Sequence, residues 1–194
     1  MRGLVLIAAL LWAAPASAAD IVDHFKAYLA IYKGTFEFLQ VGADKALTSG
    51  PESEAVINRA NGYIQIIGRA GTDRVLTMAD YHKADGGEVL VVGSSDCADA
   101  CDFTIEFFSA AATGLQPLAK ETMVPEVAPS RFIKSGCTGP TNAPTINYVP
   151  ARIGTSLTLK PWYGYEVEEQ MSKAVRDSLQ DVVLSWDRVH GRFR

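Results

Sequence analysis

Residues 63–109 read YIQIIGRAGTDRVLTMADYHKADGGEVLVVGSSDCADACDFTIEFFS, and this stretch decides the fold. It contains runs rich in β-branched and aromatic residues, separated by breaks that hold Gly and Asp, over residues 63–67, 75–82, 88–93 and 103–109. Residues 85–87 (DGG) lie between the second and third runs, and glycine accepts the positive φ that tight hairpin turns require. We therefore predict an antiparallel meander over this stretch.

Residues with the sequence signals of helices precede the meander. Apolar residues recur at the helix period from Ile21 to Tyr32, with Asp20 as a cap at the start and Gly34 as a stop. Nearer the meander, residues 51–62 begin with a proline at a first-turn position, continue with glutamates and close with a glycine. These signals predict one long N-terminal helix and a second, shorter one.

The residues after the meander are less regular. Residues 110–145 are rich in Pro and Gly and are predicted as loop. Residues 153–159 alternate like a strand that Pro161 would stop, residues 166–179 have helical spacing, and residues 182–194 resemble a closing hairpin. The predicted fold class is therefore α+β: a predominantly antiparallel β-sheet with one or two N-terminal helices packed on it.

Two short segments share a pattern. Residues 81–86 (YHKADG) and 186–191 (WDRVHG) each hold an aromatic residue, a basic residue two positions later and a glycine five positions later. The pattern suggests two similar hairpins.

The first residues of the chain indicate export. A single Arg precedes an uncharged apolar run over residues 4–14, and residues 16–18 read ASA, a small-residue cleavage site. The run is too short to span a bilayer, which needs about 20 apolar residues. We predict that residues 1–18 are a cleaved signal peptide. The remaining residues, 19–194, are then expected to form a single globular domain, periplasmic or extracellular and without a membrane span.

Charge and motifs restrict the function. The chain carries 18 Lys and Arg against 22 Asp and Glu, a net charge of −4. This acidic balance argues against nucleic acid or an anionic membrane face as a partner. The sequence contains no phosphate-binding glycine loop, dinucleotide fingerprint, G-x-S-x-G or H-E-x-x-H. We therefore predict no cofactor, and the absence of such motifs weighs against an enzyme.

The three cysteines would meet oxidising surroundings after export. The chain-entropy model gives about 2 kcal/mol for a bridge between Cys97 and Cys101, and nearer about 4 kcal/mol for one between Cys97 and Cys137. We nevertheless expect the shorter bridge, because the small and polar residues between Cys97 and Cys101 favour a turn that brings the two thiols together. Cys137 is then left as a possible free thiol.

The same turn carries three carboxylates at a three-residue period, Asp96, Asp99 and Asp102. Calcium takes such oxygen ligands, but the ligand spacing of an EF-hand and its terminal Glu are missing. These residues are a weak candidate for calcium, and a solvated hairpin tip is the simpler interpretation.

The aromatic segment at residues 161–165 (PWYGY) supplies the candidate binding residues Trp162, Tyr163 and Tyr165. Trp and Tyr are enriched in binding hot spots, and they are equally common as core anchors. Our leading hypothesis is an exported binding module, possibly an inhibitor or immunity protein, that recognises a protein or another cell-envelope macromolecule. Two alternatives stand beside it: an exported hydrolase that uses carboxylates or Cys137, and a small-ligand or calcium carrier.

Overall fold

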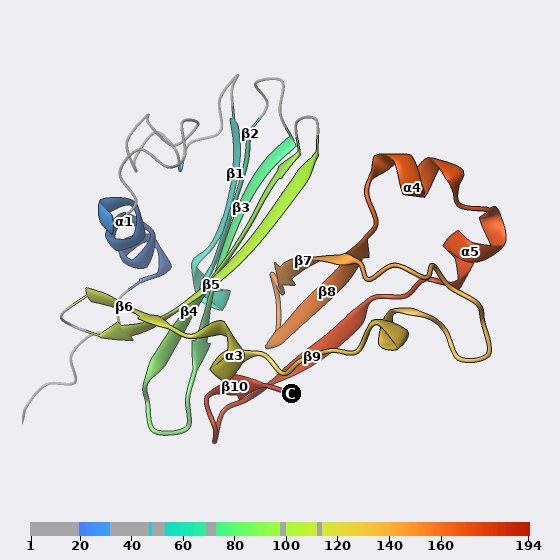
Figure 1. The fold of residues 1–194 in the computed structure, drawn as a ribbon. Coiled ribbons are helices and arrows are strands. Elements are labelled where there is room, and N and C mark those ends of the chain that lie inside the picture. The colour runs from blue at the N-terminus through green and yellow to red at the C-terminus, as the bar shows by residue number, and fades with distance from the viewer. Residues whose placement is uncertain (1–19, 32–46, 48–52, 69–72, 98–99, 112–113) are drawn as a thin grey trace, which may run out of the picture.

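Two antiparallel sheets dominate the computed structural model of the chain, shown in Figure 1. The structure describes residues 20–31, 47, 53–68, 73–97, 100–111 and 114–194. The predicted signal peptide, residues 1–18, lies outside the described residues. Of the helices that the structure describes, none combines the length and apolarity needed to cross a membrane.

The larger sheet has six strands, and each strand pairs antiparallel with its neighbour in sequence. Its strands are β1 (Ser53–Asn58), β2 (Tyr63–Gly68), β3 (Asp73–His82), β4 (Glu88–Cys97), β5 (Cys101–Ala111) and β6 (Gly114–Leu118). The predicted meander is thus confirmed and extends by one strand at each edge. The β3–β4 turn forms as expected, because Gly86 adopts φ 87° and the Asp85 carboxylate accepts a 2.9 Å hydrogen bond from the Gly87 N–H.

The smaller sheet has four strands in the order β10-β9-β8-β7. They are β7 (Thr145–Pro150), β8 (Ser156–Trp162), β9 (Val182–Asp187) and β10 (Arg192–Phe193). The predicted closing hairpin is confirmed as β9 and β10. Pro161 does not end its strand as predicted. β9 pairs with β8 only up to Leu159, so Pro161 has a neighbouring strand on one side alone, where a missing N–H is tolerated.

The helices are short, apart from α1 (Ile21–Ile31), which forms where the apolar spacing predicts it. The others are η2 (Arg59–Asn61), α3 (Lys120–Met123), η3 (Pro129–Phe132), α4 (Tyr165–Gln170) and α5 (Lys173–Ser178). The stretch predicted as loop, residues 110–145, therefore also contains β6, α3 and η3. Its Pro117 lies in β6, an edge strand that pairs only with β5.

The second helix predicted over residues 51–62 is wrong. Residues 53–58 form β1, which pairs along its whole length with β2. The β-branched pair Val56 and Ile57 favours a strand, and an available partner strand outweighs the helix-start signals. Gly62 does close a helical turn, at φ 56°, but that turn is only the short η2 between two strands.

The larger sheet is buried on both faces, which creates two cores. One core lies between this sheet and α1, and the other lies between the two sheets. Because side chains alternate along a strand, Leu90 and Val92 of β4 face α1, whereas Val89 and Val91 face the smaller sheet. This double burial explains why residues 89–92 read VLVV, with no polar position among them.

The two sheets approach each other closely where β4 passes β7. A Cβ atom at Gly93 would lie 2.6 Å from the backbone oxygen of Tyr148, so only glycine fits there. Further along, the buried Tyr81 of β3 donates its hydroxyl to the backbone oxygen of Ser156, at 2.8 Å. Contacts of this kind fix the smaller sheet on one face of the larger one, and they position the segment that follows β8.

Candidate functional site

The end of β8 and the start of α4 bring two of the three predicted binding residues together. Trp162 is the last residue of β8, Tyr165 is the first of α4, and Gly164 between them has φ 90°. The Trp162 ring meets the Tyr165 ring edge to face at 5.7 Å between centroids, and it meets Phe103 of β5 in the same way at 5.6 Å. We call Phe103, Trp162 and Tyr165 the aromatic cluster.

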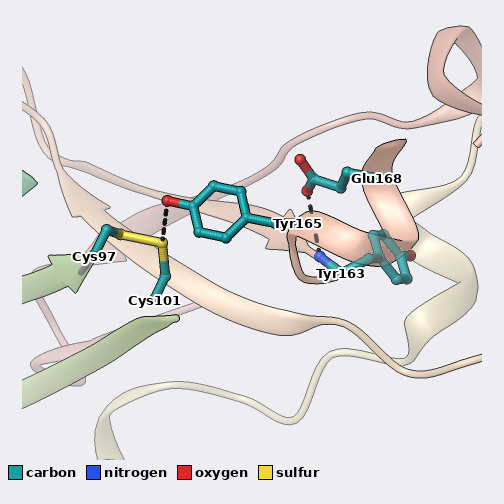
Figure 2. The surroundings of a disulfide bond; sticks show 5 residues. All are labelled: Cys97, Cys101, Tyr163, Tyr165 and Glu168. Atoms are coloured by element: carbon teal, nitrogen blue, oxygen red, sulfur yellow. Dashed lines mark hydrogen bonds between the residues drawn. A yellow bond between two sulfur atoms is a disulfide. The ribbon is translucent and has the colours of Figure 1, made fainter. Parts of the chain in front are cut away.

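Tyr165 of the aromatic cluster contacts the disulfide that closes the β4–β5 hairpin, as Figure 2 shows. Cys97 and Cys101 stand directly opposite each other, with 4.0 Å between their Cα atoms and their sulfurs at bonding distance. The Tyr165 hydroxyl lies 3.6 Å from the Cys101 sulfur. It must be the donor, because a disulfide sulfur carries no proton. The expected short bridge is present, and one end of it supports Tyr165.

Tyr163, the third predicted residue, turns away from the disulfide (Figure 2). Its backbone N–H donates to the Glu168 carboxylate at 3.4 Å, which closes the turn into α4. The side chain is half-buried, and this burial raises the pKa of the Tyr163 hydroxyl. Tyr163 is therefore better placed to hold the turn than to join the contact surface of Trp162 and Tyr165.

Exposure differs within the aromatic cluster. Tyr165 is 47% exposed, whereas Phe103 and Trp162 are half-buried. Sequence reasoning missed Phe103 because the alternation of its strand suggests an ordinary core position. Only the packing of the smaller sheet places it beside Trp162. The cluster is thus part core anchor and part surface, with Tyr165 as its outward ring.

Carboxylates of α4 lie beside Tyr165 of the aromatic cluster. Glu166 and Glu169 are exposed, at the next residue and one helical turn after Tyr165. Asp102 is also exposed, but alternation along β5 turns it to the opposite face of the larger sheet from Phe103. Asp96 lies opposite Asp102 in the β4–β5 register, and it pairs with Arg74 at 2.8 Å between Oδ2 and Nε. The α4 side of the cluster, which we call its rim, therefore carries a negative charge from Glu166 and Glu169.

The weak calcium candidate receives no support from the described residues. Asp96 is engaged by Arg74, and Asp99 lies outside the residues that the structure describes. Within the described ranges, no group of three or more His, Cys, Asp or Glu side chains is arranged to hold a metal ion.

Cys137 is exposed and not disulfide-bonded, in a turn where its N–H donates to the Lys134 carbonyl at 3.1 Å. A thiol nucleophile needs a basic partner such as histidine. The ion-pair contacts of the histidines are to carboxylates: His24 to Asp80 and Glu88, His82 to Glu88, and His190 to Asp187. Cys137 appears in none of these contacts.

His24 forms a buried cluster that the sequence does not reveal. Its Nδ1 lies 2.9 Å from the Asp80 carboxylate of β3, and its Nε2 lies 3.7 Å from the Glu88 carboxylate of β4. The hydrogen bond to Asp80, aided by the charges nearby, raises the pKa of His24 against the opposing effect of burial. The three side chains tie α1 to the larger sheet. Their positions in sequence, far apart and on different elements, gave no spacing signal.

A pocket of about 460 Å³ opens beside α3, at the margin of the core between the sheets. Its walls include the apolar Val124, Ile146 and Leu159, and its rim carries Lys120, Glu121 and Glu126. The Lys120 ammonium lies 4.3 Å from the centre of the Tyr148 ring, which also lines the pocket. This volume falls within the range of small-molecule sites, about 300–1,000 Å³.

Comparison with known proteins bears on the fold alone. The sequence matches no protein-family model and no curated protein. The chain is similar to the solved structure of a domain of an uncharacterized protein from Porphyromonas gingivalis W83, with a TM-score of 0.57 and 14% sequence identity. The match covers 90% of this chain and 96% of that chain, so the similarity extends over both sheets.

Proposed function

We propose that the chain is an exported binding protein whose contact surface is the aromatic cluster around Tyr165. The observation that carries this proposal is the support of a 47% exposed tyrosine by a disulfide on one side and Trp162 on the other. The predicted signal peptide supports export, and a bridge such as Cys97–Cys101 persists in oxidising compartments. The partner is a protein or another macromolecule of the cell envelope, as an inhibitor or immunity protein would require.

Rigidity makes this surface suited to binding. Association costs about 0.5–1.5 kcal/mol for each mobile side chain that must be ordered at an interface. The Tyr165 ring already packs on Trp162, and its hydroxyl is hydrogen-bonded to the Cys101 sulfur. Little side-chain freedom of Tyr165 is therefore left to lose on binding. Tyrosine and tryptophan are frequent hot-spot residues because they combine large apolar faces with a polar atom.

Charge indicates the chemistry of the partner. Glu166 and Glu169 are exposed beside Tyr165 of the aromatic cluster. Lysine or arginine side chains would pair with these carboxylates and would also be attracted to the face of Tyr165. We therefore infer a partner that presents basic residues next to an apolar contact.

The test is affinity capture from cell-envelope extract with the exported chain as bait, compared among variants. Tyr165→Ala removes the outward ring, and Glu166→Lys combined with Glu169→Lys reverses the charge of the rim. Both should lose the protein that the wild-type chain captures. Asp181→Lys is the matched control, because Asp181 is exposed in the segment between α5 and β9 and should leave capture unchanged.

Binding of the captured protein should then be measured by calorimetry with purified components. Loss of a central aromatic contact costs about 2 kcal/mol or more, which is about a thirtyfold rise in Kd. Equal Kd values for the wild type, Tyr165→Ala and the double glutamate variant would refute the proposed surface. The double glutamate variant and Asp181→Lys should keep the wild-type melting temperature, since the replaced side chains are exposed. Tyr165→Ala loses the ring contact with Trp162, so its folded state should be checked by circular dichroism before Kd is compared.

The pocket beside α3 favours a second candidate, binding of a small amphipathic ligand. Its apolar wall and charged rim would suit a molecule with an apolar body and one polar group. A Val127→Trp variant would fill the pocket and should abolish binding of a fluorescent amphipathic probe such as anilinonaphthalene sulfonate. Unchanged probe binding in this variant would exclude the pocket as the site.

A further inference from the structure

Three loops meet at the end of the molecule away from the aromatic cluster. They are residues 83–87 between β3 and β4, 151–155 between β7 and β8, and 188–191 between β9 and β10. The Ala84 N–H donates to the Arg188 carbonyl at 2.8 Å, and the Trp186 N–H donates to the Thr155 carbonyl at 2.9 Å. We call these loops, together with β10, the hairpin end. Figure 1 shows the β3–β4 turn and β10 at the bottom, with α4 and α5 near the top.

The charge of the hairpin end is opposite to that of the whole chain. Residues 83–87, 151–155 and 187–194 contain five Lys and Arg and two Asp, whereas the full chain has 18 basic and 22 acidic residues. Of the two carboxylates, Asp187 is buried and is bound by His190 and Arg194, and only Asp85 is exposed. The basic residues are Lys83, Arg152, Arg188, Arg192 and Arg194, all of them exposed except the half-buried Lys83.

Two aliphatic side chains project from the same end. Ile153 is 74% exposed in the β7–β8 loop, and Val189 is 78% exposed in the β9–β10 hairpin. They are the two most exposed large hydrophobic residues in the described part of the chain. One exposed aliphatic residue needs no explanation. Two of them on neighbouring loops, among five basic residues, form an amphipathic surface.

We propose that the hairpin end docks on an anionic lipid bilayer, with Ile153 and Val189 entering the boundary between headgroups and acyl chains. The arginines and Lys83 would contact lipid phosphates, as basic residues do on peripheral membrane proteins. A negative net charge does not prevent this docking. Physiological salt screens interactions between exposed charges beyond about 8–10 Å. The charge of the hairpin end, and not that of the whole chain, therefore determines its attraction to lipid headgroups.

The aliphatic residues favour a bilayer over a soluble polyanion. A nucleic acid or an acidic polysaccharide offers phosphates or carboxylates but no apolar layer, and it would leave Ile153 and Val189 in water. A bilayer surface accepts both kinds of side chain, because its headgroups carry phosphates and its acyl chains are apolar.

Docking in this way would also orient the protein. β8 starts with Ser156 next to the hairpin end and ends with Trp162 in the aromatic cluster, a distance of about 20 Å at 3.3 Å per residue. The aromatic cluster would then face away from the bilayer. The membrane proposal does not rest on the proposed function, and either can fail alone.

The experiment is co-sedimentation of the exported chain with vesicles of two compositions, phosphatidylcholine alone and phosphatidylcholine with phosphatidylglycerol. We expect binding to the anionic vesicles that weakens as salt is added, and at least tenfold weaker binding to the neutral ones. The double variant Arg152→Glu, Arg188→Glu should bind anionic vesicles at least tenfold more weakly, since each basic residue contributes about fivefold. Arg176→Glu is the control, because Arg176 is exposed on α5, at the other end of the molecule.

A second pair of variants tests insertion. The double variant Ile153→Ser, Val189→Ser keeps every charge and should weaken binding to anionic vesicles at least fivefold, whereas Val183→Ser, at a 58% exposed position in β9, should not. Equal binding to both vesicle types, or none, would overturn the proposal. So would binding that survives the loss of both aliphatic residues and is competed equally well by duplex DNA, which would indicate a general polyanion site.

Discussion

His24 of α1 and Asp80 of β3 form a buried ion pair, with 2.9 Å between Nδ1 and Oδ1. Their side chains are only 7% and 6% exposed, and Glu88 lies on the other side of the imidazole. The imidazole of His24 is thus placed between two carboxylates under the N-terminal helix. This contact is the polar link between α1 and the sheet, and its strength depends on the protonation of His24.

We expect His24→Leu to lower the free energy of unfolding by about 3 kcal/mol, because Asp80 would remain buried without its histidine partner and Glu88 would keep only the contact with the exposed His82. The wild-type contribution should also depend on pH. The folded state raises the pKa of His24, so it holds the proton more tightly than the unfolded chain. The contribution is full below pH about 6.5 and is lost as the pH rises through the folded-state pKa.

Urea unfolding between pH 6 and pH 9 checks this prediction. The stability of the wild type should fall across the range, and that of His24→Leu should change less. Val22→Ala on the same helix is the control. It loses buried packing, worth about 2 kcal/mol, and should keep the pH dependence of the wild type. Parallel pH profiles for the wild type and His24→Leu would contradict the assignment.

We expect intact mass analysis without reductant to show one bridge and one thiol that alkylates. Peptide mapping should assign the bridge to Cys97 and Cys101 and the thiol to Cys137, which is exposed. Replacing both bridged cysteines with serine should cost about 2 kcal/mol, the value for closing so short a loop. Cys137→Ser should cost less than about 0.5 kcal/mol. Two free thiols at Cys97 and Cys101 would refute the pairing.

Gly93→Ala tests the close approach of the two sheets. The added methyl group would lie 2.6 Å from the Tyr148 backbone oxygen, so β4 and β7 would have to separate. We expect a loss of about 3 kcal/mol, measured by thermal or urea unfolding. Ser95→Ala, two residues along the same strand, should change stability by less than about 0.5 kcal/mol. A Gly93→Ala chain as stable as the wild type would show that the sheets are not packed so tightly.

The meander could be predicted from sequence because its signals are local. Each strand from β2 to β5 alternates or is continuously apolar, and the turns between them contain residues such as Asp85 and Gly86 that favour positive φ or cap a turn. The edge strands could not be predicted in the same way. β1 begins with residues that also suit a helix start, and β6 contains a proline, so both depend on the neighbour they pair with.

The candidate site could be predicted from the sequence only in part, for a similar reason. The PWYGY segment identified Trp162 and Tyr165, and the small, polar residues between Cys97 and Cys101 predicted the bridge. Neither pattern shows that Tyr165 donates to the Cys101 sulfur or that Phe103 completes the aromatic cluster, since these contacts join residues about 60 positions apart. The resemblance between residues 81–86 and 186–191 was more informative than its length suggests. The two turns lie side by side, linked by the hydrogen bond from Ala84 to Arg188.

Asp187 accepts the hydrogen bonds that hold the second of these turns. Its substitution should change how the stability of the fold decreases at acidic pH. Its Oδ1 accepts the backbone N–H groups of Val189 and His190 at 3.0 and 3.2 Å, and its Oδ2 lies 2.9 Å from the His190 ring and 3.1 Å from Arg194. The hydrogen bond from the His190 side chain is the main reason that the pKa of Asp187 is lowered.

The unfolded chain therefore binds a proton at Asp187 at a higher pH than the folded chain does. The stabilising contribution is complete above the unfolded pKa, about 3.9, and it disappears as the pH falls through the lower folded value. Asp187→Asn keeps an oxygen acceptor for the turn but cannot titrate. Its melting temperature should fall less than that of the wild type between pH 5 and pH 2, while Asp85→Asn in the other hairpin retains the wild-type slope. A wild-type slope in Asp187→Asn would mean that the carboxylate charge does not stabilise the hairpin.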